Sequence, residues 1–157
     1  MFFFQEITLK NNTIILLNLF MLMKFKSRLL KKHLVRATEF RLKLLSLFKA
    51  NNESLSIKEI ENKLGNFDRV TLYRTLKLFN EKGVIHEVFH GGGGKRYALC
   101  KEGCSENKHS HSHLHFHCSK CDKSFCIDDN MPKLHLPGYL VKNCDLNVYG
   151  LCQKCNI

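Results

Sequence analysis

The sequence predicts an α+β protein with two small domains. Three observations indicate this class: apolar residues recur at helical intervals in three successive segments, two strand-like runs flank four consecutive glycines, and two C-x-x-C pairs lie near the C-terminus. A chain of 157 residues forms one ordinary domain or two small ones. A domain below about 80 residues often needs a metal or a partner to supplement its core, and a metal bound by the cysteines would meet this need.

The first two predicted helices have recognisable ends. Thr38 is placed to cap the first helix, which should end near residues 51–52. Ser56 and Glu59 have the spacing of a capping box, and Gly65 ends the short helix that follows. The apolar faces of the two helices are formed by Leu42, Leu45, Leu47 and Phe48, and by Ile57, Ile60 and Leu64.

A third helix and a hairpin complete the first domain. Asp68 can cap this helix and Gly83 can end it, and its apolar residues are Val70, Leu72, Leu76 and Phe79. The strand-like runs Val84–His90 and Lys95–Leu99 follow, with the four glycines between them as a hairpin tip. Two helices with a short link and then a hairpin predict a winged helix-turn-helix domain over residues 24–99.

The remainder of the chain divides into a linker and a second domain. Residues 100–109 are polar and show no periodicity, which predicts a hinge. Short strands are predicted around Leu114 and Phe116, at Ser124–Ile127 and at Asp145–Tyr149, so that residues 110–157 form the second domain.

The first residues, 1–23, are expected to be an extension from a wrongly assigned start. The apolar run Ile14–Met23 is interrupted by Asn18 and is too short to span a bilayer, and a basic stretch follows it in place of a signal-peptide cleavage site. Met21 and Met23 stand immediately before that basic stretch. The sequence therefore predicts no membrane partner.

The charge of the chain favours a polyanionic partner. The chain carries 25 Lys and Arg against 14 Asp and Glu, a formal net charge of +11, which suits nucleic acid or an anionic membrane surface. A basic helix face is also typical of a solvated surface, but the helix-turn-helix and the glycine-tipped hairpin favour DNA. The residues predicted to contact base edges and phosphates are Arg41, Arg69, Thr71, Tyr73, Arg74 and Lys77.

Four of the eight cysteines form two C-x-x-C pairs, Cys118 with Cys121 and Cys152 with Cys155. Four thiolates suit the tetrahedral shell of a structural zinc ion, and a closed shell leaves no open position for catalysis. Disulfides, free thiols and an iron–sulfur cluster are the alternatives. In the absence of a cleavable signal peptide, thiolate metal binding in a reducing cytoplasm is favoured, and residues 110–157 are expected to be a small α/β domain stapled by zinc.

Histidines alternate along the tract before the first cysteine pair: His109, His111, His113, His115 and His117. A strand's period of two places these imidazoles on one face. His113 and His115 are the stronger ligand candidates, and a flexible metal-binding linker is the alternative interpretation of the tract. Further soft donors are His86, Cys100, Cys104 and Cys126. Such a mixed set favours zinc over manganese, with ferrous iron as the alternative.

Two of these patterns together are similar to a known family. The segment Val70–Leu76 looks like a T-x-Y-R-x-L recognition helix, and the H-x-H-x-x-C-x-x-C arrangement that begins at His113 is closed by a second C-x-x-C pair. From about Leu29 to the C-terminus, the chain resembles the ferric uptake regulator family. The resemblance implies a homodimer that binds operator DNA when a sensory metal is loaded, with a separate structural zinc in its C-terminal dimerisation domain.

Within that family, the zinc-uptake regulators are the nearest likeness. The segments around His86 and Cys100 resemble those that supply sensory zinc ligands, which implies a sensory shell of His86, Cys100 and one or both of His113 and His115. Ser54 stands where iron regulators have a sensory histidine, which argues against iron. Cys126 stands where the family has a glutamate ligand, so the fourth regulatory donor is expected to be the thiolate of Cys126 or another histidine. The link between the C-x-x-C pairs is shorter than is usual, so the sequence does not assure the family's dimerisation helix.

The sequence therefore predicts a cytoplasmic, zinc-responsive transcriptional repressor that binds a palindromic operator as a homodimer. Zinc would fix the relative orientation of the two domains. The alternatives are an iron- or peroxide-responsive regulator of the same family and a zinc-storage or chaperone protein that does not bind DNA. No carboxylate lies in the histidine tract to act as a general base, and the histidines belong to a short domain with no evident substrate pocket, which argues against a zinc hydrolase. The sequence predicts neither an enzymatic activity nor a small-molecule substrate.

Overall fold

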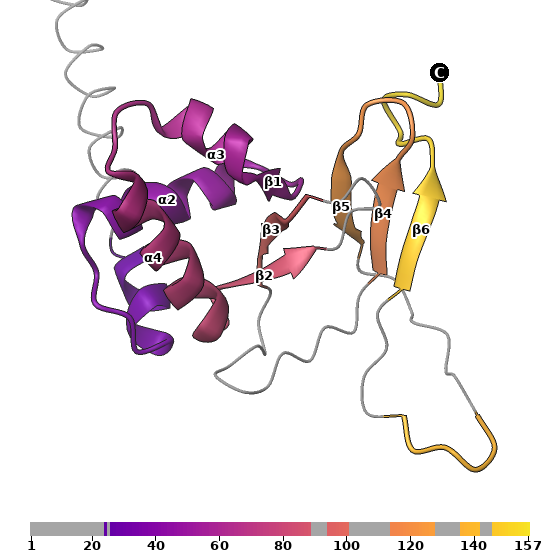
Figure 1. Ribbon diagram of the computed structural model, residues 1–157, viewed down its shortest axis with the longest axis horizontal. Helices are drawn as coiled ribbons and strands as arrows, with labels where there is room; N and C mark the ends of the chain where they lie inside the picture. The colour runs from indigo at the N-terminus through magenta and orange to yellow at the C-terminus, as the bar shows by residue number, and fades with distance from the viewer. Residues whose placement is uncertain (1–23, 25, 89–93, 101–113, 128–135, 142–145) are drawn as a thin grey trace, which may run out of the picture.

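The computed structural model describes residues 24, 26–88, 94–100, 114–127, 136–141 and 146–157. In these ranges the chain forms a helical part with a small sheet, and a separate C-terminal sheet beside it (Figure 1). The predicted extension over residues 1–23 lies outside the described residues, as do residues 101–109 of the predicted hinge and His109, His111, His113 and Cys104. None of the described helices has the length and apolar character that a membrane crossing requires.

The three predicted helices are present with the predicted caps. Helix α2 spans Glu39–Ala50, α3 spans Ile57–Leu64 and α4 spans Arg69–Glu81. The side chains of Thr38, Ser56 and Asp68 accept the backbone N–H groups of Arg41, Glu59 and Thr71, which satisfies donors that a helix start leaves without an intrahelical partner. The capping box at Ser56 is complete.

The wing sheet has one more strand than the sequence predicted. Strands β2 (Ile85–Val88) and β3 (Arg96–Leu99) form the predicted antiparallel hairpin, and the two-residue strand β1 (Leu55–Ser56) pairs with the other edge of β3. The order among the described strands is β1-β3-β2. A core to which α2, α3 and α4 all contribute packs with this sheet: Leu30, Leu44, Leu45, Phe48, Leu55, Ile60, Leu72, Leu76, Phe79, Val84 and Ile85.

Glu59 connects the start of α3 to the wing sheet. Its Oε2 accepts hydrogen bonds from the backbone N–H and the hydroxyl of Ser56, both at 2.7 Å, and lies 2.8 Å from Nη2 of the buried Arg96. Burial alone would raise the pKa of Glu59, but these hydrogen bonds and the guanidinium outweigh it, so that its pKa is below the ordinary value.

We expect Glu59→Gln to destabilise the first domain at neutral pH. The free energy of unfolding should fall by about 1–3 kcal/mol, because Arg96 then lacks its anionic partner. Water screens part of this interaction, since the Glu59 side chain is 37% exposed. A depressed folded pKa means that the carboxylate stabilises the fold above its unfolded pKa of about 4.3 and that this stability is lost as the pH falls through the folded pKa. Urea unfolding should therefore show a difference between wild type and variant at pH 7 that shrinks toward pH 3. An equal difference at both pH values would contradict this role of the charge.

The C-terminal sheet joins distant segments. Strand β4 (Leu114–Cys118) is central, β5 (Ser124–Ile127) pairs with it antiparallel, and β6 (Leu146–Gly150) pairs with it in parallel. Among the described residues of this domain there are strands and turns but no helix, so the α part of the predicted α/β domain is not found there. The face that carries Phe116 and Phe125 is apolar, whereas His115, His117 and Ser124 are buried on the other side of the strands.

Candidate metal centres and nucleic-acid interface

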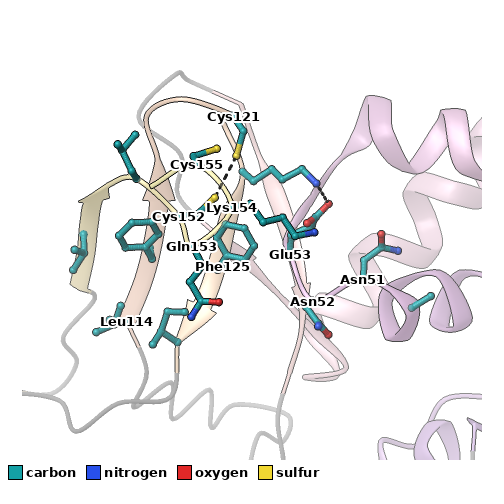
Figure 2. Close-up of a pocket in the computed structure, with 16 residues that line it drawn as sticks. Asn51, Asn52, Glu53, Leu114, Cys121, Phe125, Cys152, Gln153, Lys154 and Cys155 are labelled. Atoms are coloured by element: carbon teal, nitrogen blue, oxygen red, sulfur yellow. Dashed lines mark hydrogen bonds and ion pairs between the residues drawn. The ribbon is translucent and has the colours of Figure 1, made fainter. Parts of the chain in front are cut away.

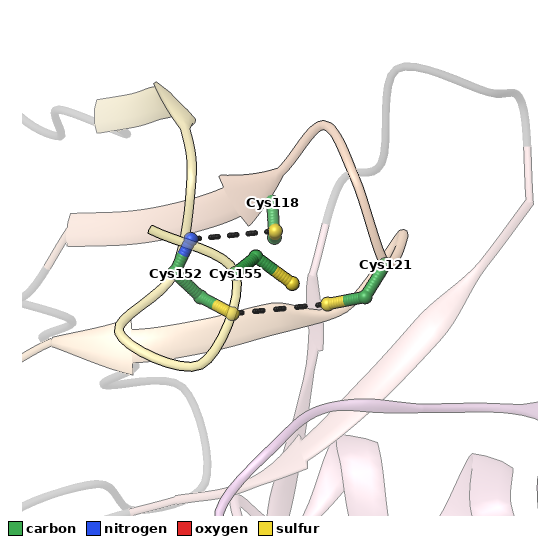
Figure 3. A group of neighbouring side chains, drawn as sticks. All are labelled: Cys118, Cys121, Cys152 and Cys155. Carbon is green, nitrogen blue, oxygen red and sulfur yellow. Dashed lines mark hydrogen bonds between the residues drawn. The ribbon is translucent and has the colours of Figure 1, made fainter. Parts of the chain in front are cut away.

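The parallel pairing of β4 with β6 brings the two C-x-x-C pairs together. Cys118 is the last residue of β4, Cys121 lies in the turn that follows, and Cys152 and Cys155 lie just beyond the end of β6. Because Cys118 and Gly150 are register partners, both pairs leave the sheet at the same end (Figure 3). The four Sγ atoms lie within 4.8 Å of one another.

This geometry fits a tetrahedral metal. Zn–S bonds of about 2.3 Å place two sulfurs of a tetrahedral site about 3.8 Å apart, and the Sγ atoms of Cys121 and Cys152 are separated by 3.8 Å. A hydrogen bond from the backbone N–H of Cys152 lowers the pKa of Cys118 to about 6, whereas the neighbouring thiol of Cys152 and burial raise the pKa of Cys155 to about 12. Four sulfurs this close cannot all ionise unless a cation neutralises them. The donor set therefore suits a soft divalent metal.

A second group of metal-ligating side chains joins the two domains. His86 of β2, His115 of β4 and Cys126 of β5 place one donor atom each within 4.8 Å of the others. The Nε2 atoms of the two histidines are 3.3 Å apart, and Cys126 Sγ lies 3.5 Å from His86 Nε2. Tetrahedral zinc requires about 3.3 Å between two nitrogens and about 3.6 Å between a nitrogen and a sulfur. The two separations from His86 Nε2 therefore match those of a tetrahedral zinc site.

Cys100 lies on the other side of the His86 ring. Its Sγ is 3.6 Å from Nδ1 of His86, whereas His115 and Cys126 face Nε2 of the same ring. Among the predicted regulatory ligands that the structure describes, it brings together His86, His115 and Cys126 and leaves Cys100 outside that group. A partner on the second nitrogen of a ligating histidine fixes which nitrogen faces the metal.

His117 lies on the same side of β4 as His115 but has other partners. Its Nδ1 is 2.7 Å from the hydroxyl of Ser124 and its Nε2 is 3.0 Å from Oδ1 of Asn147. The ring is buried and stacks on Tyr149. Both nitrogens of His117 are thus engaged in the sheet.

The predicted recognition helix presents its polar face to solvent. Arg69, Thr71, Tyr73, Arg74 and Lys77 are exposed along α4, while Leu72, Thr75, Leu76 and Phe79 are buried. Val70, which was predicted to belong to the apolar face, is instead 55% exposed beside them. The sequence spacing could have shown this exposure, because Val70 lies two residues from Leu72 and residues two apart do not share a helix face.

Three of the predicted DNA contacts also have partners within the protein. Nζ of Lys77 lies 3.9 Å from the carboxylate of Glu81, one turn further along α4. Arg41 donates to the backbone oxygen of Arg36 at 2.9 Å, so it holds the turn before α2. Arg69 lies 3.4 Å from the carboxylate of Glu61 on α3, and this ion pair spans the helix-turn-helix.

An apolar hollow that the sequence did not reveal lies beside the four cysteines. It has a volume of about 840 Å³ and is lined by Leu114, Phe116, Phe125 and Val148 of the sheet and by Asn51, Asn52 and Glu53 at the end of α2 (Figure 2). Its lining is mainly hydrophobic, and the cysteines at its rim are those of the four-sulfur group.

Comparison with known proteins places the chain in a family. The profile of the Ferric uptake regulator family matches residues 32–147. The chain belongs to this family. The Ferric uptake regulation protein of Staphylococcus aureus is 32% identical over 137 residues, which cover 82% of this chain and 93% of that protein. The Peroxide operon regulator of Bacillus subtilis is 28% identical over 107 residues, which cover 63% of this chain and 66% of that regulator.

Solved structures show the same fold. The ferric uptake regulator of Vibrio cholerae superposes with a TM-score of 0.58 at 22% identity, covering 80% of this chain and 98% of that chain. A zinc uptake regulator complexed with zinc and DNA gives a TM-score of 0.57 at 19% identity, covering 86% of this chain and 93% of that chain. The predicted fold class and family are confirmed, and the family consists of metal-responsive transcription regulators, not enzymes.

Proposed function

We propose that this chain is a zinc-responsive transcriptional repressor that binds a palindromic operator as a homodimer in the cytoplasm. The observation that carries the proposal is the group formed by His86, His115 and Cys126, because it takes one ligand from the wing and two from the C-terminal sheet. A metal there joins the DNA-binding part of the protein to the part proposed to form the dimer. The chain's membership of a metalloregulator family supports the same function.

The proposed metals differ in role. Cys118, Cys121, Cys152 and Cys155 would hold a structural zinc that ties together the ends of β4 and β6. His86, His115 and Cys126 would hold the regulatory metal, with His113 as the proposed further ligand. Two imidazoles and a thiolate favour zinc over harder ions. The solved zinc uptake regulator with the same fold is complexed with zinc and DNA.

His86 and His115 would couple metal binding to the relative orientation of the two domains. Bound zinc would supply a cross-link between the two domains. His86 is 3% exposed and His115 is 6% exposed, so neither ring can turn away freely without a movement of its strand. A ligand that binds one relative orientation of the domains better than others shifts the population toward it. In a dimer, that orientation sets the spacing of the two α4 helices against the two half-sites.

The proposed DNA contacts are Arg69, Thr71, Tyr73, Arg74 and Lys77 of α4, with Arg41 near the backbone. All five α4 side chains are exposed on one connected part of the helix, and the buried residues of α4 hold it against the core. Arginine and lysine would neutralise phosphates, while threonine and tyrosine could contact base edges.

The test is an operator-binding titration of protein that keeps its structural metal but has lost the regulatory one. Zinc, ferrous iron and manganese should be added in parallel, with free metal buffered. Zinc should restore binding at the lowest free concentration. Full operator affinity without regulatory metal would contradict the switching mechanism. Recovery with ferrous iron but not zinc would favour the alternative of an iron-responsive regulator of the same family. Absence of any sequence-specific binding at moderate salt would favour a zinc-storage protein.

We expect Glu61→Gln to strengthen DNA binding modestly. The carboxylate of Glu61 is paired with the exposed Arg69, whose side chain is 77% exposed, so the pair adds little stability. Removing this charge frees Arg69 for a phosphate and removes an anion from the DNA-facing side. Operator affinity at low salt should rise about two- to fivefold and the gain should shrink as salt is raised. A double-mutant cycle with Arg69→Ala is the control, because the same Glu61 change should have a smaller effect where Arg69 is absent.

A further inference from the structure

A second connection between the domains contains none of the proposed metal ligands. The backbone N–H of Ser54, which lies between α2 and β1, donates to the backbone oxygen of Ser124 on β5 at 2.8 Å. Next to it, Glu53 and Phe125 form an antiparallel β-bridge. Ser54 and Ser124 are both fully buried. The chain between α2 and β1 therefore adds a short stretch of pairing to the edge strand of the C-terminal sheet.

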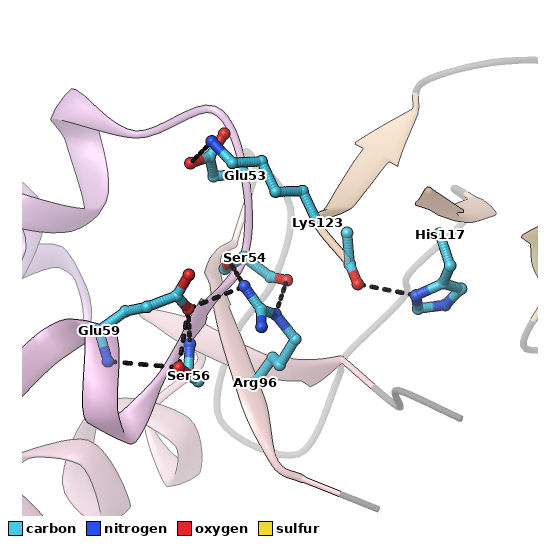
Figure 4. A network of polar contacts seen from close by, with 8 residues as sticks. Glu53, Ser54, Ser56, Glu59, Arg96, His117 and Lys123 are labelled. Atoms are coloured by element: carbon cyan, nitrogen blue, oxygen red, sulfur yellow. Dashed lines mark hydrogen bonds and ion pairs between the residues drawn. The ribbon is translucent and has the colours of Figure 1, made fainter. Parts of the chain in front are cut away.

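Arg96 holds the Ser54 side of this connection. Its Nε donates to the hydroxyl of Ser54 at 3.1 Å, and its Nη2 lies 2.8 Å from both the carbonyl oxygen of Ser54 and Oε2 of Glu59 (Figure 4). Arg96 is only 6% exposed. A planar guanidinium offers several donors in fixed directions, so it fixes the backbone of Ser54 against α3 and β3 at once. A point-charge ammonium could not reproduce this arrangement.

Other side chains hold the Ser124 side. The hydroxyl of Ser124 contacts Nδ1 of His117, and the other nitrogen of His117 contacts Asn147 on β6. At the rim, Nζ of Lys123 lies 2.6 Å from Oε1 of Glu53 and forms an ion pair across the two domains. Hydrogen bonds thus run from Glu59 on α3 to Asn147 on β6 through backbone and side chains that take no part in either metal group.

The Ser54–Ser124 contact lies close to the regulatory metal group on the same strand. Ser124 and the proposed ligand Cys126 lie two residues apart on β5, which is a separation of about 7 Å along a strand. Two domains that are held together only at the Ser54–Ser124 contact can still rotate relative to each other about it. A second contact at a separate position removes most of this rotation. A metal at Cys126 would therefore provide the second attachment, close to the first.

We propose that the Ser54–Ser124 contact, fixed by Arg96, is a metal-independent pivot about which the DNA-binding domain turns when the regulatory metal leaves. The domains stay joined at this point in both states, and metal binding changes their angle without assembling or dissolving the joint. The inference rests on the proposed function only in taking the regulatory metal as the perturbation. It also accounts for Ser54, which stands at a position where the sequence resemblance implied a metal ligand in iron regulators.

The test is amide hydrogen exchange of Ser54, followed by NMR on full-length protein that keeps its structural metal. Exchange is measured with the regulatory metal bound and after its removal. The pivot predicts that protection of the Ser54 amide changes by less than about threefold between these states. Exchange of Ser54 that becomes fast, at a rate near that of an exposed amide, when the regulatory metal is removed would overturn the proposal, because the metal would then be what makes the joint.

Variants separate the joint from the fold. Arg96→Lys should raise the exchange rate of Ser54 about tenfold or more in both metal states, as loss of hydrogen bonds to a charged group implies. The amides of Leu72 and Phe79 in α4 report whether the first domain remains folded. If Arg96→Lys fails to fold, Lys123→Gln tests the same joint from its exposed rim and should raise the rate of Ser54 by a few fold, whereas Lys95→Gln, which breaks a similar exposed pair with Glu87 inside the wing, should not.

The exchange measurement uses no DNA, so its failure differs from failure of the proposed function. Protein whose Ser54 amide stays protected but whose operator binding ignores zinc would retain the pivot and lose the zinc-repressor proposal. Operator binding that responds to zinc, with a Ser54 amide that loses protection when zinc is removed, would give the opposite result. An unchanged Ser54 rate in both Arg96→Lys and Lys123→Gln would show that these side chains do not hold the joint.

Discussion

Replacing Cys118 by serine is expected to release the metal from the four-cysteine group and to unfold the C-terminal sheet while α2, α3 and α4 stay folded. Cys118 is buried at the end of the central strand, and the sheet around it consists of three short strands with one largely uncovered apolar face. A structural zinc site contributes about 10–16 kcal/mol of apparent binding free energy, which is comparable to the whole stability of a domain at about 5–15 kcal/mol. The sheet cannot compensate for its loss.

Zinc content and thermal unfolding together measure this effect. With the regulatory metal removed from both proteins, purified Cys118→Ser protein should contain about one zinc per chain fewer than wild type, and circular dichroism should show the helical part melting alone. Cys126→Ser, also freed of regulatory metal, is the matched control, because it removes a thiol from the neighbouring strand but leaves the four-cysteine group intact. Its zinc content and its C-terminal sheet should match those of wild type under the same conditions. A Cys118→Ser protein with full zinc content and an unchanged C-terminal sheet would disprove the structural role.

The helical domain was predictable because its signals are local. Thr38, Ser56 and Asp68 cap helices within three residues of themselves, and the structure confirms all three. The short strand β1 was missed because two residues carry no periodicity and its pairing with β3 joins residues about forty positions apart. The contact of Arg96 with Ser54 has the same origin, since nothing near Arg96 in the sequence shows which distant backbone oxygen it reaches.

The metal groups show where spacing suffices and where it fails. The C-x-x-C spacing identified the four cysteines, but only the parallel pairing of β4 with β6 brings the second pair to the first. The period of two placed His115 and His117 on one face, yet it could not show that Ser124 and Asn147 engage His117 while His86 faces His115. Likewise, no sequence pattern distinguishes the two nitrogens of His86, and that distinction separates Cys126 from Cys100.

Because Cys126 and Cys100 face different nitrogens of His86, their replacements should have different effects. Cys126→Ser should abolish zinc-dependent operator binding, whereas Cys100→Ser should only weaken it. Cys126 faces the nitrogen of His86 that His115 also faces, so we expect its thiolate to bind the metal directly. Cys100 faces the other nitrogen and would orient the ring. Loss of such an outer partner costs about 10–100-fold in metal affinity, and loss of the direct thiolate should cost more.

Cobalt loaded into the regulatory group, with zinc kept in the four-cysteine group, distinguishes the two roles directly. A thiolate bound to cobalt gives a sulfur-to-metal charge-transfer band, which should disappear in Cys126→Ser and persist in Cys100→Ser. The opposite pattern would make Cys100 the ligand, as the resemblance to zinc-uptake regulators implied, and would require the His86 ring to present its other nitrogen to the metal. Because the separations from His86 Nε2 to His115 and to Cys126 already match those of a tetrahedral site, such a rearrangement would have to break a fitting geometry to form another.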